Sequence, residues 1–125
     1  MKILDKIKQV LSHKENKEEV KLLEPHTFVS IKDKLYIEFD LEKVVNENLE
    51  KKHQDIVDLL IQNLKSKKQG YVKINPKLPD MEEIIFYSQN TFELMIQNSD
   101  KSFVNQKEIE EKEVKSILEH KLLNI

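Results

Sequence analysis

Hydrophobic and polar residues alternate along this chain with two different periods, and each period predicts one type of secondary structure. Between residues 35 and 41 every second residue is apolar, a period of two that predicts a strand with one buried face. Residues 27–31 form a second run rich in strand formers. The short segment Lys32-Asp33-Lys34 separates the two runs and therefore predicts a β-hairpin.

The longest predicted helix lies between residues 49 and 64. Apolar residues fall there at helical spacing, among Glu, Lys and Gln residues that favour helix. Its start stays open among three possible N-cap residues, which are Asp40, Asn46 and Asn48. Lysines at 65, 67 and 68 complement the negative end of a helix dipole, and Gly70 is predicted to supply a left-handed C-cap.

Both ends of the chain are also predicted to be helical. An apolar stripe predicts a helix over residues 3–11, within an N-terminal segment, residues 1–24, that could form a semi-independent arm before Pro25. Whether residues 12–24 are helix or linker stays open. Near the other end, Asn105 and Glu108 resemble a capping box at the start of a final helix. Its apolar positions are Ile109, Val114, Ile117, Leu118 and Leu122.

Three more strands are predicted before that helix, at residues 71–75, 84–87 and 92–96. The middle one is apolar throughout, so both its faces need cover, which either helices on each side of the sheet or a second chain would supply. The predicted order is α-β-β-α-β-β-β-α. We expect a single α+β domain over residues 1–125, with a mostly antiparallel sheet of about five strands and helices packed on it. This order is similar, at the level of the fold, to that of small dimeric roadblock-type adaptors.

The composition excludes several kinds of chemistry. The chain has a formal net charge of −2, a single glycine and no cysteine, arginine, alanine or tryptophan, a bias that favours an AT-rich genome. Without cysteine there is no disulfide or thiolate, and one glycine is too few for a phosphate-binding loop. The four histidines lack the spacing of a metal site, and no serine lies in a nucleophile motif. We therefore predict no catalytic residue, no cofactor and no metal, and expect that the protein is not an enzyme.

The start of the chain is charged throughout and lacks the apolar centre of a signal peptide. No run approaches the roughly 18 consecutive apolar residues of a membrane helix. We therefore expect a cytoplasmic protein that does not contact the membrane.

These exclusions lead to a hypothesis of protein binding. The sequence favours a non-catalytic protein-interaction module that forms a homodimer and acts as an adaptor, a chaperone or an inhibitor of a partner protein. The broad apolar face of the long helix, with the strand after it, is the predicted protein interface. Its residues are Ile56, Val57, Leu60, Ile61, Leu64 and Tyr71.

A second hypothesis rests on a basic cluster. Three lysines near the end of the long helix precede Tyr71 and one follows it. The Tyr71 ring could stack on a base while the ammonium groups contact phosphate. The cluster consists of Lys65, Lys67, Lys68 and Lys73. This alternative is a nucleic-acid-binding accessory protein of a phage, plasmid or other AT-rich element. It is the less favoured one, because the helix dipole explains three of the lysines without a ligand.

Overall fold

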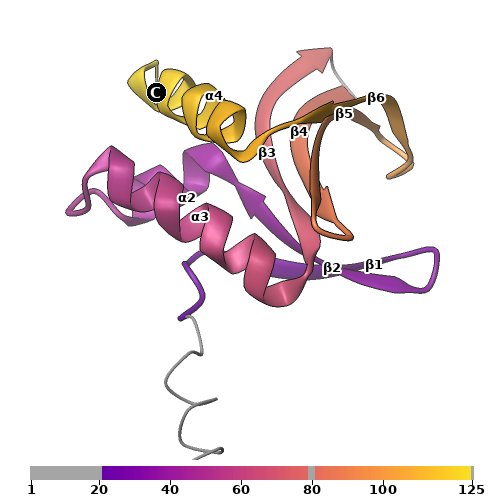
Figure 1. Ribbon diagram of the computed structural model, residues 1–125, viewed down its shortest axis with the longest axis horizontal. Helices are drawn as coiled ribbons and strands as arrows, with labels where there is room; N and C mark the ends of the chain where they lie inside the picture. Colours follow the sequence, from indigo (N-terminus) through magenta and orange to yellow (C-terminus); the bar gives the residue numbers. More distant parts are fainter. Residues whose placement is uncertain (1–20, 79–80, 125) are drawn as a thin grey trace, which may run out of the picture.

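Six strands and three helices make up the described part of the chain (Figure 1). The computed structural model describes residues 21–78 and 81–124, with the side chains of residues 75–78, 105 and 106 outside that description. The predicted helix over residues 3–11 lies outside the described residues. The elements are β1 (Thr27–Ile31), β2 (Lys34–Asp40), α2 (Leu41–Glu47), α3 (His53–Lys67), β3 (Gln69–Leu78), β4 (Met81–Ser88), β5 (Thr91–Asn98), β6 (Phe103–Ile109) and α4 (Glu111–Leu123).

The sheet confirms the predicted α+β class. Its strands lie side by side in the order in which they follow along the chain, from β1 to β6. Every neighbouring pair is antiparallel except β2 and β3, which run parallel because α2 and α3 carry the chain back between them. No helix among the described residues is both long and apolar enough to cross a membrane.

The sixth strand corrects the prediction for the C-terminal region. Residues 103–109 form β6, so Asn105 and Glu108 do not cap a helix, and α4 begins only at Glu111. Pairing with β5 places Ile109 opposite Phe92 and buries both side chains. A capping box contributes about 1 kcal/mol locally, which is less than the backbone pairing and apolar burial of a whole strand.

The region between the candidate N-cap Asp40 and the end of the long predicted helix contains two helices, α2 and α3, with residues 48–52 between them. Asp40 caps α2 by accepting a hydrogen bond from the backbone N–H of Lys43, at 3.3 Å. Asn48 ends α2, because its side-chain amide donates to the carbonyl oxygens of Val44 and Glu24, both at 2.7 Å. Asn48, which was one of the candidate N-caps, therefore terminates α2 instead.

The end of α3 differs from the prediction at one position. Lys68, not Gly70, has the left-handed backbone conformation, with φ of 68°, and its N–H donates to the carbonyl of Leu64 at 2.8 Å. Gly70 lies in β3, opposite Ile37 of β2. A Cβ atom at Gly70 would lie 2.4 Å from Cγ2 and 2.6 Å from the carbonyl oxygen of Ile37, so glycine is needed there for space.

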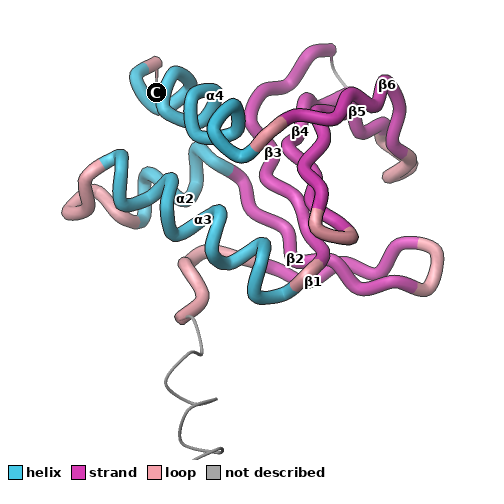
Figure 2. Tube along the Cα trace, viewed as in Figure 1, coloured by secondary structure: helices cyan, strands magenta, loops and turns pink. Residues whose placement is uncertain are grey.

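All three helices pack on one face of the sheet (Figure 2). Alternate sheet residues such as Phe39, Val72 and Ile85 point to that face and form the main core with the helices. Of the two kinds of cover expected for the 84–87 strand, the helices therefore supply it on one side only. Ile84 and Phe86 belong to a second apolar cluster on the opposite face.

The opposite face is covered by the curvature of the sheet itself. Tyr36 of β2 and Phe103 of β6 have ring centroids only 6.3 Å apart, although three strands lie between them. In a flat sheet four strand spacings of about 4.8 Å would separate them by roughly 19 Å. The sheet therefore bends into a half-barrel, whose interior holds the aromatic cluster of Tyr36, Tyr71, Phe86 and Phe103.

The segment before β1 is tied to α3 by a buried amide. The side chain of Asn63 accepts a hydrogen bond from the backbone N–H of Leu23 at 2.7 Å and donates to the carbonyl of Lys21 at 3.2 Å. Both Asn63 and Leu23 are buried. Residues 21–24 are not helical, which settles that part of the open question over residues 12–24.

Candidate functional site

The predicted protein interface lies inside the chain. Its six residues, Ile56, Val57, Leu60, Ile61, Leu64 and Tyr71, are each at most 3% exposed. The five from α3 belong to the main core under the sheet, and Tyr71 belongs to the aromatic cluster. The structure therefore corrects this prediction: these side chains already pack against their own chain and offer no free surface.

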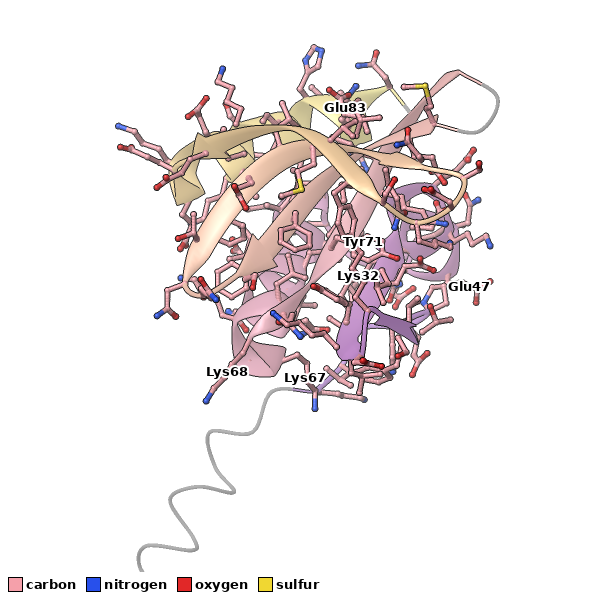
Figure 3. All side chains as sticks on the ribbon, turned by 90° about the vertical axis from the view of Figure 1, so that its right-hand side faces the viewer. Lys32, Glu47, Lys67, Lys68, Tyr71 and Glu83 are labelled. Atoms are coloured by element: carbon pink, nitrogen blue, oxygen red, sulfur yellow. The ribbon has the colours of Figure 1, made fainter. Side chains whose placement is uncertain are left out.

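The predicted nucleic-acid contact is not assembled as one patch. Lys65, Lys67 and Lys68 lie at the end of α3, where Lys65 forms an ion pair with Glu111. Figure 3 shows Lys67 and Lys68 at one end of the molecule, away from Tyr71. Lys73 points into the half-barrel, and Tyr71 is fully buried, so its ring cannot stack on a base. Only the lysines at the helix end remain together.

A polar network crosses the interior of the half-barrel beside the aromatic cluster. Glu38 lies directly opposite Tyr71 in the parallel β2–β3 pair, and the Tyr71 hydroxyl donates to its carboxylate at 2.6 Å. The side-chain amide of Gln97 donates to the same hydroxyl at 3.4 Å. The ammonium group of Lys73 lies 3.8 Å from the Glu38 carboxylate and 3.4 Å from that of Glu82. Strand register alone thus brings together groups from four strands.

The electrostatics of this network favour a structural role. Burial by itself would raise the pKa of Glu38, but the Tyr71 hydrogen bond and the Lys73 charge outweigh it and hold that pKa below its usual value. Burial, and then the hydrogen bond to Glu38, raise the pKa of the Tyr71 phenol. The phenol therefore stays protonated at neutral pH. No buried side-chain nitrogen or oxygen among the described residues lacks a hydrogen-bond partner.

A cavity of about 280 Å³ opens at the mouth of the half-barrel, between the β1–β2 and β5–β6 turns. We call it the mouth cavity. Its lining residues are Ile31, Lys32, Lys34, Tyr36, Lys101, Ser102 and Phe103. Lys32 and Asp33 both have positive φ, as a two-residue type I′ hairpin turn requires. Sequence reasoning missed this cavity, because its two turns are about 70 residues apart and only the bend of the sheet joins them.

The two edges of the sheet differ in their protection. Natural sheet edges usually carry charges or bulges that prevent pairing with another chain. The β6 edge has Lys107, Glu108 and a register shift opposite β5. Strand β1, sequence TFVSI, has no charged residue and pairs only with β2 within the part of the chain that the structure describes. We call β1 together with Leu35 the β1 edge.

Exposed apolar side chains mark the same edge. Phe28 of β1 is 44% exposed, and Leu35, opposite Ser30 on β2, is 60% exposed. Both lie on the helix-facing side of the sheet, because Phe28 pairs with the core residue Ile37 and Leu35 is two residues before it. An uncharged edge strand beside two exposed apolar side chains has the chemistry of a protein contact surface.

Comparison with known proteins identifies no relative. No protein-family model, no curated protein and no solved structure matches this chain. Among the described residues, no group of three or more His, Cys, Asp or Glu side chains is arranged to hold a metal ion.

Proposed function

We propose that the protein is a non-catalytic protein-interaction module that forms a homodimer through its β1 edge and acts as an adaptor, a chaperone or an inhibitor of a partner protein. The observation that carries the proposal is the uncharged β1 strand, which pairs only with β2 among the described residues, with Phe28 and Leu35 exposed beside it. The occupant of this edge is a second copy of the same chain, which adds its own β1 strand in antiparallel orientation.

The backbone geometry fits this pairing. Ile31 and Lys34 flank a two-residue turn, so they exchange hydrogen bonds with each other, and the pattern alternates along the strand. Thr27, Val29 and Ile31 therefore direct their backbone groups toward β2. Phe28 and Ser30 direct their N–H and C=O groups outward, where a second chain can reach them.

The strand is also self-complementary. If two copies pair about Val29, Phe28 of one copy lies opposite Ser30 of the other, and both pairs can exchange hydrogen bonds. Ser30 is small, so the incoming Phe28 ring has room to contact Leu35 on the neighbouring strand. The same pairing brings the exposed carboxylate of Glu24 close to the lysine-containing β1–β2 turn of the other copy, which favours the antiparallel register.

The interior of the half-barrel supports a binding role over catalysis. The Tyr71 hydroxyl donates its hydrogen bond to the Glu38 carboxylate, and the raised pKa of the phenol makes it a poor nucleophile and a poor base at neutral pH. A catalytic pair needs an accessible group with an unmet hydrogen bond, whereas Tyr71 is fully buried and the partly buried Glu38 already accepts its hydrogen bond.

The test is the mass in solution, measured by size-exclusion chromatography with light scattering over a range of concentrations. We expect twice the 14.9 kDa of one chain for the wild type. Ser30→Pro removes an outward-facing N–H that β2 does not use, so it should give a folded monomer. Leu35→Lys should weaken the dimer by introducing a charge at the contact.

Leu123→Lys is the matched control, because Leu123 is a leucine on α4 with 76% exposure and lies far along the chain from the β1 edge. It should leave the dimer intact. Circular dichroism checks that each variant is folded. A wild type that is monomeric at every concentration, or a dimer that survives both Ser30→Pro and Leu35→Lys in folded protein, would overturn the proposal.

A further inference from the structure

The mouth cavity gathers positive charge from two turns that are distant in sequence. Lys32 and Lys34 come from the β1–β2 hairpin, and Lys101 comes from the β5–β6 turn, where its φ is 73°. Lys32 lies on the side of the molecule that faces the viewer in Figure 3. None of the three ammonium groups has a carboxylate within 4.0 Å among the residues that the structure describes. The lining itself contains no acidic residue.

One carboxylate near the cavity is already occupied. Asp100 accepts hydrogen bonds from the backbone N–H of Ser102 at 3.0 Å and from its hydroxyl at 2.6 Å. These bonds hold the turn in place and lower the pKa of Asp100, with a smaller contribution from the charge of Lys32. The carboxylate therefore orders the turn that presents Lys101, and it does not line the cavity.

Two aromatic rings form the wall of the cavity below the lysines. Tyr36 and Phe103 are held by the rest of the aromatic cluster, with Phe103 only 4.8 Å from Phe86 between ring centroids. Rings packed in this way are preorganised and lose little entropy when a planar group binds against them. Phe103 remains partly exposed, so part of its ring is accessible from the cavity.

The Tyr36 hydroxyl is accessible to solvent. The residue as a whole is only 8% exposed, but its hydroxyl has no protein partner among the described residues and is not among their buried unpaired polar atoms, so water reaches it. Tyr71, the other tyrosine of the aromatic cluster, has its hydroxyl bonded to Glu38. The Tyr36 hydroxyl, on a residue that lines the cavity, can donate to a bound ligand that supplies an acceptor.

We propose that the mouth cavity binds a nucleoside phosphate, with the base against Tyr36 and Phe103 and the phosphates near Lys32, Lys34 and Lys101. Aromatic rings stack on any base, and ammonium groups bind phosphate as point charges, so together they select a planar anion. The volume of about 280 Å³ is close to the lower end of ligand pockets, roughly 300 Å³.

The experiment is a titration of ¹⁵N-labelled protein with ATP, read by amide chemical shifts, with adenosine and tripolyphosphate as separate ligands. We expect ATP to shift amides in residues 31–36 and 101–103, and to bind more tightly than either part alone. Lys101→Gln should weaken ATP binding about fivefold, as the loss of one exposed charge contact predicts. The matched control is Lys67→Gln at the end of α3, which should leave the affinity unchanged.

Phe103→Leu separates the two halves of the site. It should weaken ATP and adenosine while leaving tripolyphosphate unchanged, and its amide spectrum reports whether it is folded. Equal affinity for ATP and tripolyphosphate would overturn the role of the rings, and equal affinity for ATP and adenosine would overturn that of the lysines. No shifts, or shifts confined to other residues, would overturn the site. Lys101 and Phe103 are not part of the β1 edge, so the variants at these two residues test the cavity separately from the homodimer.

Discussion

Gly70→Ala is expected to destabilise the protein although alanine adds only one methyl group. Gly70 lies opposite Ile37 in the parallel β2–β3 pair. The new Cβ would lie 2.4 Å from Ile37 Cγ2, 2.6 Å from the Ile37 carbonyl oxygen and 3.0 Å from Leu64 Cδ2. Ile37 and Leu64 are at most 1% exposed, so neither can move into solvent, and the carbonyl belongs to the sheet backbone. The two strands must therefore separate locally.

The magnitude follows from two opposing contributions. Overpacking a filled core costs about 1–3 kcal/mol. Alanine restricts the unfolded chain more than glycine, which returns about 0.4–1 kcal/mol. The expected net loss in the free energy of unfolding is about 1–2 kcal/mol, which lowers the urea midpoint by roughly 1 M for a typical denaturant slope.

The assay is equilibrium unfolding in urea, followed by circular dichroism, with Lys68→Gly as the companion variant. Lys68 has φ of 68°, a conformation that costs about 1 kcal/mol or more for a residue with a Cβ, so glycine there should stabilise the protein. If Gly70→Ala is as stable as the wild type, the close approach to Ile37 does not exist. If Lys68→Gly is also destabilising, the left-handed position has been assigned to the wrong residue.

Three further outcomes are expected. The pKa of Glu38 is lower in the folded protein than its usual value of 4.5. The stability that Glu38 contributes is therefore present above pH 4.5 and is lost as the pH falls through the folded-state pKa. Urea unfolding between about pH 7 and pH 3 measures this loss. Tyr71→Phe should lower the free energy of unfolding by about 1–3 kcal/mol at pH 7 and flatten that acid dependence, because it removes the hydrogen bond that lowers the pKa of Glu38. An unchanged pH profile would contradict the hydrogen bond as the cause of the lowered pKa. Asn63→Ala should abolish the protection of the Leu23 amide against hydrogen exchange while the sheet amides stay protected, and retained protection at Leu23 would refute the tie to α3.

The elements whose conformation depends on residues close in sequence could be predicted from the sequence. The β1–β2 hairpin and β5 follow from local alternation, β4 from a continuous apolar run and most of α3 from helical spacing, and the structure contains each of these elements with bounds a few residues from those predicted. Strand β6 was missed because its own residues resemble a helix start, and only pairing with β5 decides its conformation. The division at Asn48 was missed for a similar reason, since one of its two hydrogen bonds reaches Glu24.

The candidate sites could be predicted less well, because the sequence pattern does not say what an apolar face contacts. A broad stripe on α3 fits either a partner or the chain's own sheet, and the structure selects the sheet. Tyr71 and Lys73 follow the α3 lysines in sequence, but strand alternation directs them into the half-barrel. The mouth cavity depends on the curvature of the whole sheet, which no segment encodes alone.

The single parallel pairing in the sheet has a consequence for the order of folding events. Each antiparallel pair joins strands that are consecutive in sequence through a short turn, so it can form early with little loss of chain entropy. The β2–β3 pair instead closes a loop that contains both α2 and α3. Such a long-range closure is slow, and we expect it to be the event that limits the folding rate. Gly70→Ala lies at this closure, so it should slow refolding in stopped-flow experiments, whereas a variant at a contact that forms after the closure should change mainly the unfolding rate.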